Sequence, residues 1–537
     1  MTRPTVSQAQ AWRPDALRDL GEDLDEAARR LSELVDGVVA HTAESRDYWT
    51  GAAADAARLD AQQIAADAGA LARALISASV AALDGAHQIA AARSDVLSHV
   101  EQAERDGFTV AVDGSVGVGA GPGPLLVLLA GGAEEVAEDL LESRAAELST
   151  RIGAALERLG AADADAAADL SAAFEQDREA PPPGATVPAG AGAQALEVVD
   201  AWPGMSQDRI AGQIAAMTPE QRDHLVTSFP RQVGNTDGVP WEMRVAANRL
   251  NIASAIVTET GADENSRRRI EFYRGLLGEI DDPVGGHGRI QRQIVAFDPG
   301  RASLIELNGD LASARAVAVL VPGVNTTIEG SAANTATAHR FVSGTAGDVA
   351  VITYLGGPFP QVRDPAGVLL NAGDPRYATD MAPRLVAFSE DVDRTVPPGV
   401  PVTVIGHSYG GSIVGTAEVL GLTSDRTLFL AAAGAGVGVD DPGDWHNRNP
   451  DVLRFSMTAP GDFIEAVQGI PAGPHGADPD EMPGVTRLRT GRYDDGLPVF
   501  GWEAHSGMLN RPSDAWRAIL AVIAGDSQTL QRLGSSA

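Results

Sequence analysis

The stretch Pro401–Gly415 reads PVTVIGHSYGGSIVG, and it decides the fold of the chain. A short β-branched run is followed by the pentapeptide GHSYG at 406–410 and then by small and apolar residues in a helical pattern. A G-x-S-x-G sequence between a strand and a helix is typical of a nucleophile elbow, a sharp turn whose crowded flanks require glycine. We therefore interpret Ser408 as a candidate nucleophile and Gly406 and Gly410 as the elbow glycines. A glycine-rich structural turn is the alternative.

The composition excludes several other kinds of chemistry. The chain has no Cys and no Lys among its 537 residues, which removes thiol nucleophiles, thiolate metal sites, Walker A loops and Schiff-base enzymes. It has no H-E-x-x-H pair and no Asp-rich calcium loop, so we expect neither a metal nor another cofactor. A net charge of −32 argues against nucleic acid and anionic membrane surfaces as partners.

Length and composition indicate more than one domain. Residues 1–179 are Ala-rich with helical periodicity, residues 180–195 form a Pro/Gly/Ala-rich linker, and residues 196–537 form a third zone. Within the third zone, 196–288 is predicted to be a helical lead-in and 289–537 a catalytic sheet.

The first zone is predicted to consist of long helices. Apolar residues at alternating three- and four-residue steps predict one seam along the first helix: Leu17, Leu20, Leu24, Ala27, Leu31, Leu34 and Val38. A break at 48–51 separates it from a second helix beginning at Ala52, and a further helix covers 134–174. The N-terminus lacks the features of a signal peptide, and the apolar run Pro124–Ala130 is too short to cross a bilayer, so we expect no transmembrane segment.

Strands alternating with helices after residue 289 predict a mostly parallel sheet covered by helices on both faces. The predicted strands are Ile290–Phe297, Ser303–Leu307, Ala316–Val321, Val349–Tyr354, Val402–Ile405, Thr427–Ala432, Val452–Met457 and Val485–Arg489. The predicted helices are Ala332–Val342, Ala378–Val392, Ser412–Leu420 and Asp514–Ala524. A turn at Asp298-Pro-Gly300 joins the first two strands as a hairpin. The fold class is therefore α/β, preceded by an all-α domain.

An elbow serine needs a general base and an orienting carboxylate, which follow it in the chain in the order acid, then histidine. The acid candidate is Asp462, in the turn after the strand at 452–457, although an ordinary turn Asp is the alternative. The runners-up lie in the preceding loop: Asp440, Asp441 and Asp444. His505 follows the last predicted strand and is the candidate base, with a surface-loop His as the alternative. The other downstream histidines precede that strand: His446 and His475. His407 inside the elbow is expected to point elsewhere.

The negative oxygen that develops during acyl transfer must be stabilised by two backbone N–H groups. Tyr409, the residue after the nucleophile, supplies one. The other is expected from the loop after the strand at 316–321, where glycine lets the backbone approach the substrate closely, so Gly323 or Val324 is the donor. A plain strand-end turn would also use Pro-Gly.

With these residues in place, the C-terminal part resembles a family of actinobacterial α/β-hydrolases catalogued as a domain of unknown function. The likeness spans about Trp202 to the last helix and rests on four sets of residues: GNTDGVP at 234–240 with Asn248-Arg249, Val321-Pro-Gly323, GHSYG at 406–410, and His505-Ser506. It implies an α/β-hydrolase fold with Ser408, Asp462 and His505 as the catalytic triad. The sequence departs from the family after the histidine, where Gly507-Met508 stand in place of a frequent aromatic residue.

The N-terminal zone resembles the WxG-type helical hairpins associated with type VII secretion, because Trp49-x-Gly51 lies at the break between two long helices. This resemblance implies a helical WxG-type partner protein or a homodimer through these helices; a packing Trp at a hairpin turn is the alternative. No Tyr-x-x-x-Asp/Glu export signal follows the second helix. We therefore expect a cytoplasmic location, with secretion or a cell-envelope location by a type VII route as the alternative.

The sequence as a whole predicts a serine hydrolase that cleaves an ester, or a thioester or amide, of a small acyl or lipid-like substrate through an acyl-enzyme. The alternatives are a hydrolase-fold binding module without activity, and a secretion-associated interaction protein that carries a hydrolase domain.

Overall fold

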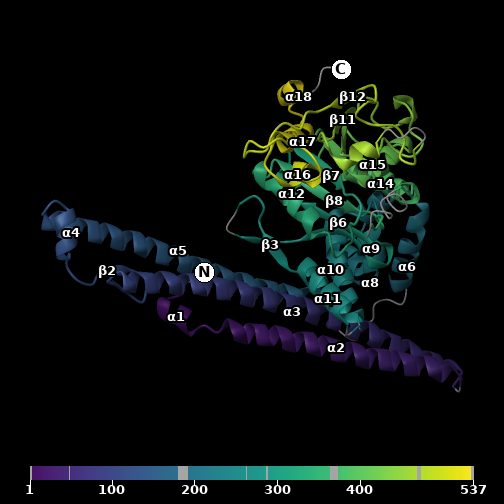
Figure 1. The fold of residues 1–537 in the computed structure, drawn as a ribbon. Coiled ribbons are helices and arrows are strands. Elements are labelled where there is room, and N and C mark those ends of the chain that lie inside the picture. The colour runs from purple at the N-terminus through teal and green to yellow at the C-terminus, as the bar shows by residue number, and fades with distance from the viewer. Residues whose placement is uncertain are drawn as a thin grey trace. The chain divides into compact units, whose positions relative to one another are not determined.

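The structure is a computed structural model, and it describes residues 3–47, 49–178, 191–259, 261, 263–285, 288–362, 373–468 and 473–533. Its internal contacts divide the chain into two compact units (Figure 1). The first comprises Met1–Ala185 and Ala253–Gly278, and the second comprises Thr186–Ile252 and Glu279–Ala537.

Long helices build the first unit. They are α1 (Val6–Ala11), α2 (Pro14–Glu44), α3 (Ala52–Arg105), α4 (Pro124–Leu129), α5 (Glu134–Arg178) and, from the later segment, α11 (Glu264–Leu277). A hairpin of β1 (Phe108–Val110) and β2 (Val116–Val118) follows α3. Helix α3 packs against both α2 and α5, and its face toward them is rich in Ala, which lets the helix axes approach closely. The long helices expected from periodicity are therefore present.

The predicted seam of α2 is only partly correct. Leu20, Leu34 and Val38 are exposed, whereas Gly21 and Ala28 are buried. A Cβ added at Gly21 would lie 2.9 Å from Cγ of Leu83 on α3, so small residues set the line of closest approach. Half of the six Leu and Val residues in the predicted seam are consequently exposed to solvent.

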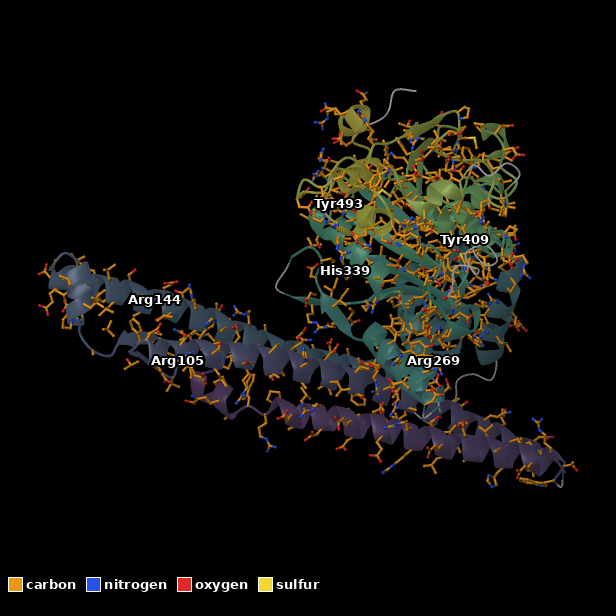
Figure 2. The ribbon with its side chains drawn as sticks, viewed as in Figure 1. Arg105, Arg144, Arg269, His339, Tyr409 and Tyr493 are labelled. Atoms are coloured by element: carbon orange, nitrogen blue, oxygen red, sulfur yellow. The ribbon has the colours of Figure 1, made fainter. Side chains whose placement is uncertain are left out.

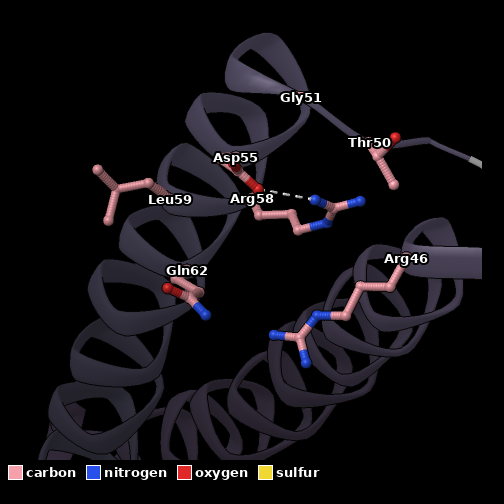
Figure 3. Close-up of a pocket in the computed structure, with 7 residues that line it drawn as sticks. All are labelled: Arg46, Thr50, Gly51, Asp55, Arg58, Leu59 and Gln62. Carbon is pink, nitrogen blue, oxygen red and sulfur yellow. Dashed lines mark hydrogen bonds and ion pairs between the residues drawn. The ribbon is translucent and has the colours of Figure 1, made fainter.

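The turn between α2 and α3 includes the 3-10 helix η1 (Ser45–Asp47) and the predicted WxG residues, Trp49 to Gly51; Tyr48, just before them, lies outside the described part. Arg58 on α3 closes this turn by donating to the backbone carbonyls of Ser45 and Trp49 and by pairing with Asp55. Figure 3 shows Arg58 and Asp55 beside a shallow cavity of about 570 Å³. Trp49 itself is 44% exposed, so it is not a core residue of the hairpin.

Helix α3 is long and apolar enough, by length and composition, to cross a membrane, and 33% of its most apolar stretch is buried in the structure. An Ala-rich helix in the middle of a helical packing arrangement has the same composition. The apolar run at 124–130 forms only the short helix α4.

The second unit begins with a helical lead-in. Its elements are α6 (Ala191–Ala201), η2 (Trp202–Gly204), α7 (Gln207–Ala215), α8 (Pro219–Ser228), α9 (Pro230–Asn235) and α10 (Trp241–Thr258). Most of the predicted linker lies outside the described residues, and its last residues, 191–195, are helical. The end of α10 and all of α11 belong to the first unit by contacts, although the sequence assigns them to the lead-in; the domain boundaries remain predictions.

A mixed sheet forms the centre of the second unit. Its strands are β5 (Gln293–Asp298), β6 (Ser303–Asn308), β7 (Ala316–Val321), β8 (Val349–Leu355), β9 (Val402–His407), β10 (Arg426–Leu430), β11 (Leu453–Met457) and β12 (Val485–Arg487). The order across the sheet is β12-β11-β10-β9-β7-β8-β6-β5. All neighbours from β8 to β12 are parallel, while β6 is antiparallel to both β5 and β8. The predicted hairpin and mostly parallel sheet are thus confirmed. The first predicted strand is split, because β4 (Arg289–Gln291) pairs with β3 (Glu279–Asp281) in a separate ribbon.

Helices cover both faces of this sheet, as Figure 1 shows. Helices α12 (Ala332–Gly344), α16 (Ala504–Asn510) and α17 (Asp514–Ala524) pack on one face, in a core that includes alternate residues of β7. Helices α14 (Arg376–Thr395) and α15 (Tyr409–Val419) pack against each other on the other face. The strands are buried on both sides, which explains why they read as continuous apolar runs.

The lead-in is fixed to the sheet by buried polar groups of the GNTDGVP segment and of α10. Asn248 donates to the carbonyls of Gly234 and of Ile294 on β5. Arg244, 1% exposed, pairs with Asp391 of α14 at 2.7 Å and donates to the carbonyl of Val295. These residues therefore have a structural role in joining the lead-in to the central sheet.

Candidate active site

The elbow lies at the carboxyl end of β9, an inner strand of the sheet. Ser408 has φ 58° and ψ −123°, a conformation that is strained for a residue with a side chain. Its backbone N–H donates to the carbonyl of Leu430, and its own carbonyl accepts from Gly411 and Ala433. Neighbouring strand ends thus hold the strained turn, which raises the serine side chain above the end of the sheet.

Three glycines make room for this turn. A Cβ at Gly406 would lie 2.6 Å from the carbonyl oxygen of Gly410, and one at Gly410 would lie 2.2 Å from that of Val321. A Cβ at Gly323 would lie 2.6 Å from Cβ of Ser408. Real side chains do not tolerate such distances, so both elbow glycines and Gly323 are required for the backbone to pack this closely.

Asp462 and His505 lie side by side, although 43 residues separate them. His505 Nδ1 is 2.9 Å from Oδ2 and 3.0 Å from Oδ1 of Asp462. Asp462 follows β11 and also accepts the backbone N–H of Ile464, as the N-cap of η5 (Phe463–Ala466). Since a carboxylate oxygen accepts, His505 carries its proton on Nδ1, and Nε2 is the ring nitrogen without a proton in this tautomer. The histidine is in the short helix α16, which the sequence did not predict.

The three candidate residues lie at the carboxyl ends of the parallel strands. His505 is adjacent to the elbow, because its backbone carbonyl accepts from His407 Nε2 at 2.8 Å and the two imidazole rings are 4.9 Å apart. Among the described residues no hydrogen bond joins the Ser408 hydroxyl to the His505 ring.

His407 has a role that the sequence interpretation missed. A carbonyl oxygen can only accept, so His407 carries its proton on Nε2 and uses it to hold the backbone of His505. Burial, assisted by the nearby His505, lowers the pKa of His407 to about 4 and keeps it neutral. Its sequence position inside the elbow gave no sign of this contact, which spans 98 residues.

Two residues expected to supply oxyanion amides adjoin Ser408: Tyr409 follows it in the chain, and Gly323 packs closely against it. Tyr409 begins α15, so its backbone N–H has no partner within the helix. Within the described residues, no hydrogen bond uses the backbone N–H of Tyr409 or Val324. Asn325, with φ 61°, fixes the adjacent loop by donating to the carbonyl of Pro360 and accepting from the N–H of Val362.

Tyr409, labelled in Figure 2, has a second contact through its side chain. Its hydroxyl donates to the backbone carbonyl of Asp374, just before α14. Burial raises the pKa of the phenol above its usual range, so it remains a neutral donor. The elbow is thereby connected to the segment that leads into α14.

The alternative acids and bases have other partners. Asp441 and Asp444 cap the 3-10 helix η4 (Pro442–Asp444), and Asp444 also accepts the N–H of Asp440, so this group stabilises its own loop. His475 is buried and its Nδ1 is 2.9 Å from the hydroxyl of Ser412, one turn along α15. His446 lies at the carboxyl end of α15, where its backbone N–H donates to the carbonyl of Glu418.

The glycine after the candidate base is explained by packing. A Cβ at Gly507 would lie 2.3 Å from the hydroxyl oxygen of Tyr493, a residue labelled in Figure 2. An aromatic ring from another segment therefore fills this space, and Met508 is fully buried beside it. The helix that carries His505 is therefore well packed, although the residues after the histidine depart from the expected family pattern.

A family model described as Alpha/beta hydrolase matches residues 298–471. Two curated relatives, the uncharacterized proteins MT2140 and Rv2079 of Mycobacterium tuberculosis strains CDC 1551 / Oshkosh and H37Rv, are each 27% identical over 276 residues. These matches cover 43% of this chain and only 40% of each relative.

A crystal structure of TT1662 from Thermus thermophilus is 15% identical, with 43% of this chain and 99% of that chain covered. Its TM-score of 0.26 is too low to add to the assignment. The family match, the sheet order and the elbow agree with one another, and the chain therefore carries an α/β-hydrolase domain together with an N-terminal helical region.

Proposed function

We propose that the protein is a serine hydrolase that cleaves esters through an acyl-enzyme, with Ser408 as nucleophile, His505 as base and Asp462 as the orienting acid. The observation that carries this proposal is the pairing of His505 Nδ1 with both oxygens of a buried carboxylate beside the strained elbow. A surface histidine or an ordinary turn aspartate has no reason to form such a pair.

In the proposed reaction His505 Nε2 takes the proton of the Ser408 hydroxyl as its oxygen attacks the carbonyl carbon. The negative oxygen that forms is stabilised by the backbone N–H of Tyr409 and that of Gly323 or Val324. His505 then gives the proton to the leaving alcohol. A water molecule, giving a proton to His505, next attacks the acyl carbon; the bond from that carbon to the Ser408 oxygen breaks, Ser408 takes the proton back and the acid is released. Asp462 favours the charged imidazolium and keeps its orientation.

Two segments beside the acid are proposed to shape the substrate site. They are residues 433–450 and residues 463–483, of which 469–472 lie outside the described part. Specificity between esters, thioesters and amides depends on such loops, since the fold itself accepts many acyl substrates.

The test is steady-state hydrolysis of a panel of simple esters by wild type, Ser408→Ala and Ser389→Ala. Ser389 is a matched control, because it is a buried serine of the same unit whose hydroxyl, among the described residues, donates to the carbonyl of Val386 within α14 and accepts the N–H of Thr423 from the loop after α15. We expect Ser408→Ala to lower kcat by at least about 10³-fold and Ser389→Ala to leave it within a few-fold. Equal activity in wild type and Ser408→Ala would exclude the proposed nucleophile.

A second proposal concerns the N-terminal helices, which we propose to be an interaction module that pairs with a second helical hairpin. The observation in its favour is a set of exposed apolar side chains on α2 and α3: Leu34, Val38, Val39, Leu59 and Ile64. Several exposed apolar side chains on one pair of helices are a feature of contact surfaces. Light scattering on wild type and Leu34→Ser tests whether the chain self-associates through this face; a monomer at all concentrations contradicts the homodimer.

A further inference from the structure

An exposed aromatic surface adjoins the candidate base. Phe500 and Trp502, on the loop before α16, are 62% and 73% exposed. The Trp502 ring is 4.8 Å from that of Phe463, and the Phe463 ring is 4.6 Å from the imidazole of His505. A row of rings therefore extends from solvent to the group that would transfer the proton.

This surface is held by the same turn that positions the acid. The N–H of Gly501 donates to the carbonyl of Pro460 at 2.9 Å. The Phe500 ring covers Gly461, where an added Cβ would lie only 2.8 Å from it. Gly461 directly precedes Asp462, so the aromatic loop and the Asp462–His505 pair are parts of one packed arrangement.

The direction of proton transfer decides which part of an ester would meet this surface. A triad histidine receives the serine proton and gives it to the leaving-group oxygen, so the leaving group departs on the histidine side of the nucleophile. The amides expected to hold the oxyanion belong to Tyr409 and the Gly323 loop, which are different segments. The rings adjoin His505 through Phe463, so they are on the histidine side of the site, where the alcohol would leave.

On this basis, and resting on the proposed function, we infer that Phe463, Phe500 and Trp502 receive the apolar alcohol portion of the substrate. The bond from the Ser408 oxygen to the carbonyl carbon forms as the bond from that carbon to the alcohol oxygen breaks. The proton moves from Ser408 through His505 to the departing alcohol. The preferred substrates are therefore esters of apolar alcohols.

The test compares two isomers, hexyl acetate and ethyl hexanoate, each referred to ethyl acetate. The isomers carry the same four additional methylenes on opposite sides of the ester, so their overall hydrophobicity is matched. A methylene half removed from water improves kcat/KM by roughly twofold, so wild type should prefer hexyl acetate to ethyl acetate by roughly 15-fold. We expect Trp502→Ser to reduce this ratio to about 4-fold and to leave the ratio for ethyl hexanoate unchanged.

Three further variants complete the design. Phe500→Ser should act like Trp502→Ser, and Trp502→Phe should keep most of the preference because it keeps an aromatic ring. Leu453→Ser is the matched control. Leu453 is 55% exposed, but it begins β11 and therefore lies at the amino ends of the parallel strands, whereas the elbow lies at their carboxyl ends. It should change neither ratio.

The outcomes separate the inference from the proposed function. If Trp502→Ser lowers both isomer ratios equally, the rings recognise apolar bulk or a lipid surface, and the assignment to the alcohol is overturned. Unchanged ratios overturn it as well. A fluorophosphonate probe is applied to the same preparations: labelling of Ser408 with unchanged ratios refutes the inference alone. Absence of both labelling and hydrolysis in folded wild type refutes the proposed serine chemistry with it.

Discussion

Lowering the pH below the ordinary pKa of histidine should reduce the free energy of unfolding, because His407 is neutral in the folded chain. In the folded chain this ring is neutral, because burial lowers its pKa to about 4 and its Nε2–H is committed to the carbonyl of His505. In the unfolded chain the same ring binds a proton at its ordinary value of about 6.5. Between these two values only the unfolded state holds the proton, so stability falls as the pH falls.

The size of the effect follows from the difference in pKa. A difference of about 2.5 units corresponds to about 3.4 kcal/mol at about 1.36 kcal/mol per unit. The ring keeps some contact with solvent, which screens the effect, so we expect about 2 kcal/mol. This contribution is complete above about pH 6.5, declines as the pH falls further, and is lost near pH 4.

The assay is urea unfolding of wild type and His407→Gln at pH 7, 5.5 and 4.5, followed by far-UV circular dichroism. The Gln amide can donate to the same carbonyl but does not titrate, so subtracting its curve removes the contribution of the many carboxylates. We expect wild type to lose about 2 kcal/mol relative to His407→Gln between pH 7 and 4.5. Parallel curves would refute the assigned burial and tautomer of His407.

Three other changes have expected outcomes. Gly323→Ala should lower kcat/KM by about 10²-fold in ester hydrolysis, because its Cβ would lie 2.6 Å from that of Ser408 and displace the nucleophile; full activity would exclude this loop from the site. Asp462→Asn should lower kcat by about 10⁴-fold, because an amide stabilises the wrong His505 tautomer; a loss under tenfold would contradict the acid assignment. Asp391→Ala should cost about 3 kcal/mol in urea unfolding by removing the fully buried one of the two carboxylates paired with Arg244, whereas a change below about 1 kcal/mol would show that the pair is dispensable.

The fold could be predicted from sequence to the extent that local patterns determine it. Strands such as β7 and β8 are buried on both faces, so each reads as an unbroken apolar run, and GHSYG between a strand pattern and a helix pattern indicates the turn at 406–410. The pattern on α2 was misleading because Leu and Val dominate a periodicity count. Gly21 and Ala28, which make the close approach to α3, carry little weight in it.

The candidate site was predictable where chain order is informative. Ser408, Asp462 and His505 follow from motif and order, and the structure brings the last two into contact; their catalytic role remains a prediction. The contact of His407 with the carbonyl of His505 and that of the Tyr409 hydroxyl with Asp374 depend on packing between distant segments. No local pattern encodes such contacts, and only the folded chain reveals them.

The most direct test of the central claim is labelling with a fluorophosphonate probe, with the modified residue located by peptide mass spectrometry. We predict one adduct per chain, on Ser408, formed by wild type and by the control Ser389→Ala and lost in both Ser408→Ala and His505→Ala. An adduct on another serine, or equal labelling of wild type and His505→Ala, would contradict a Ser408–Asp462–His505 triad.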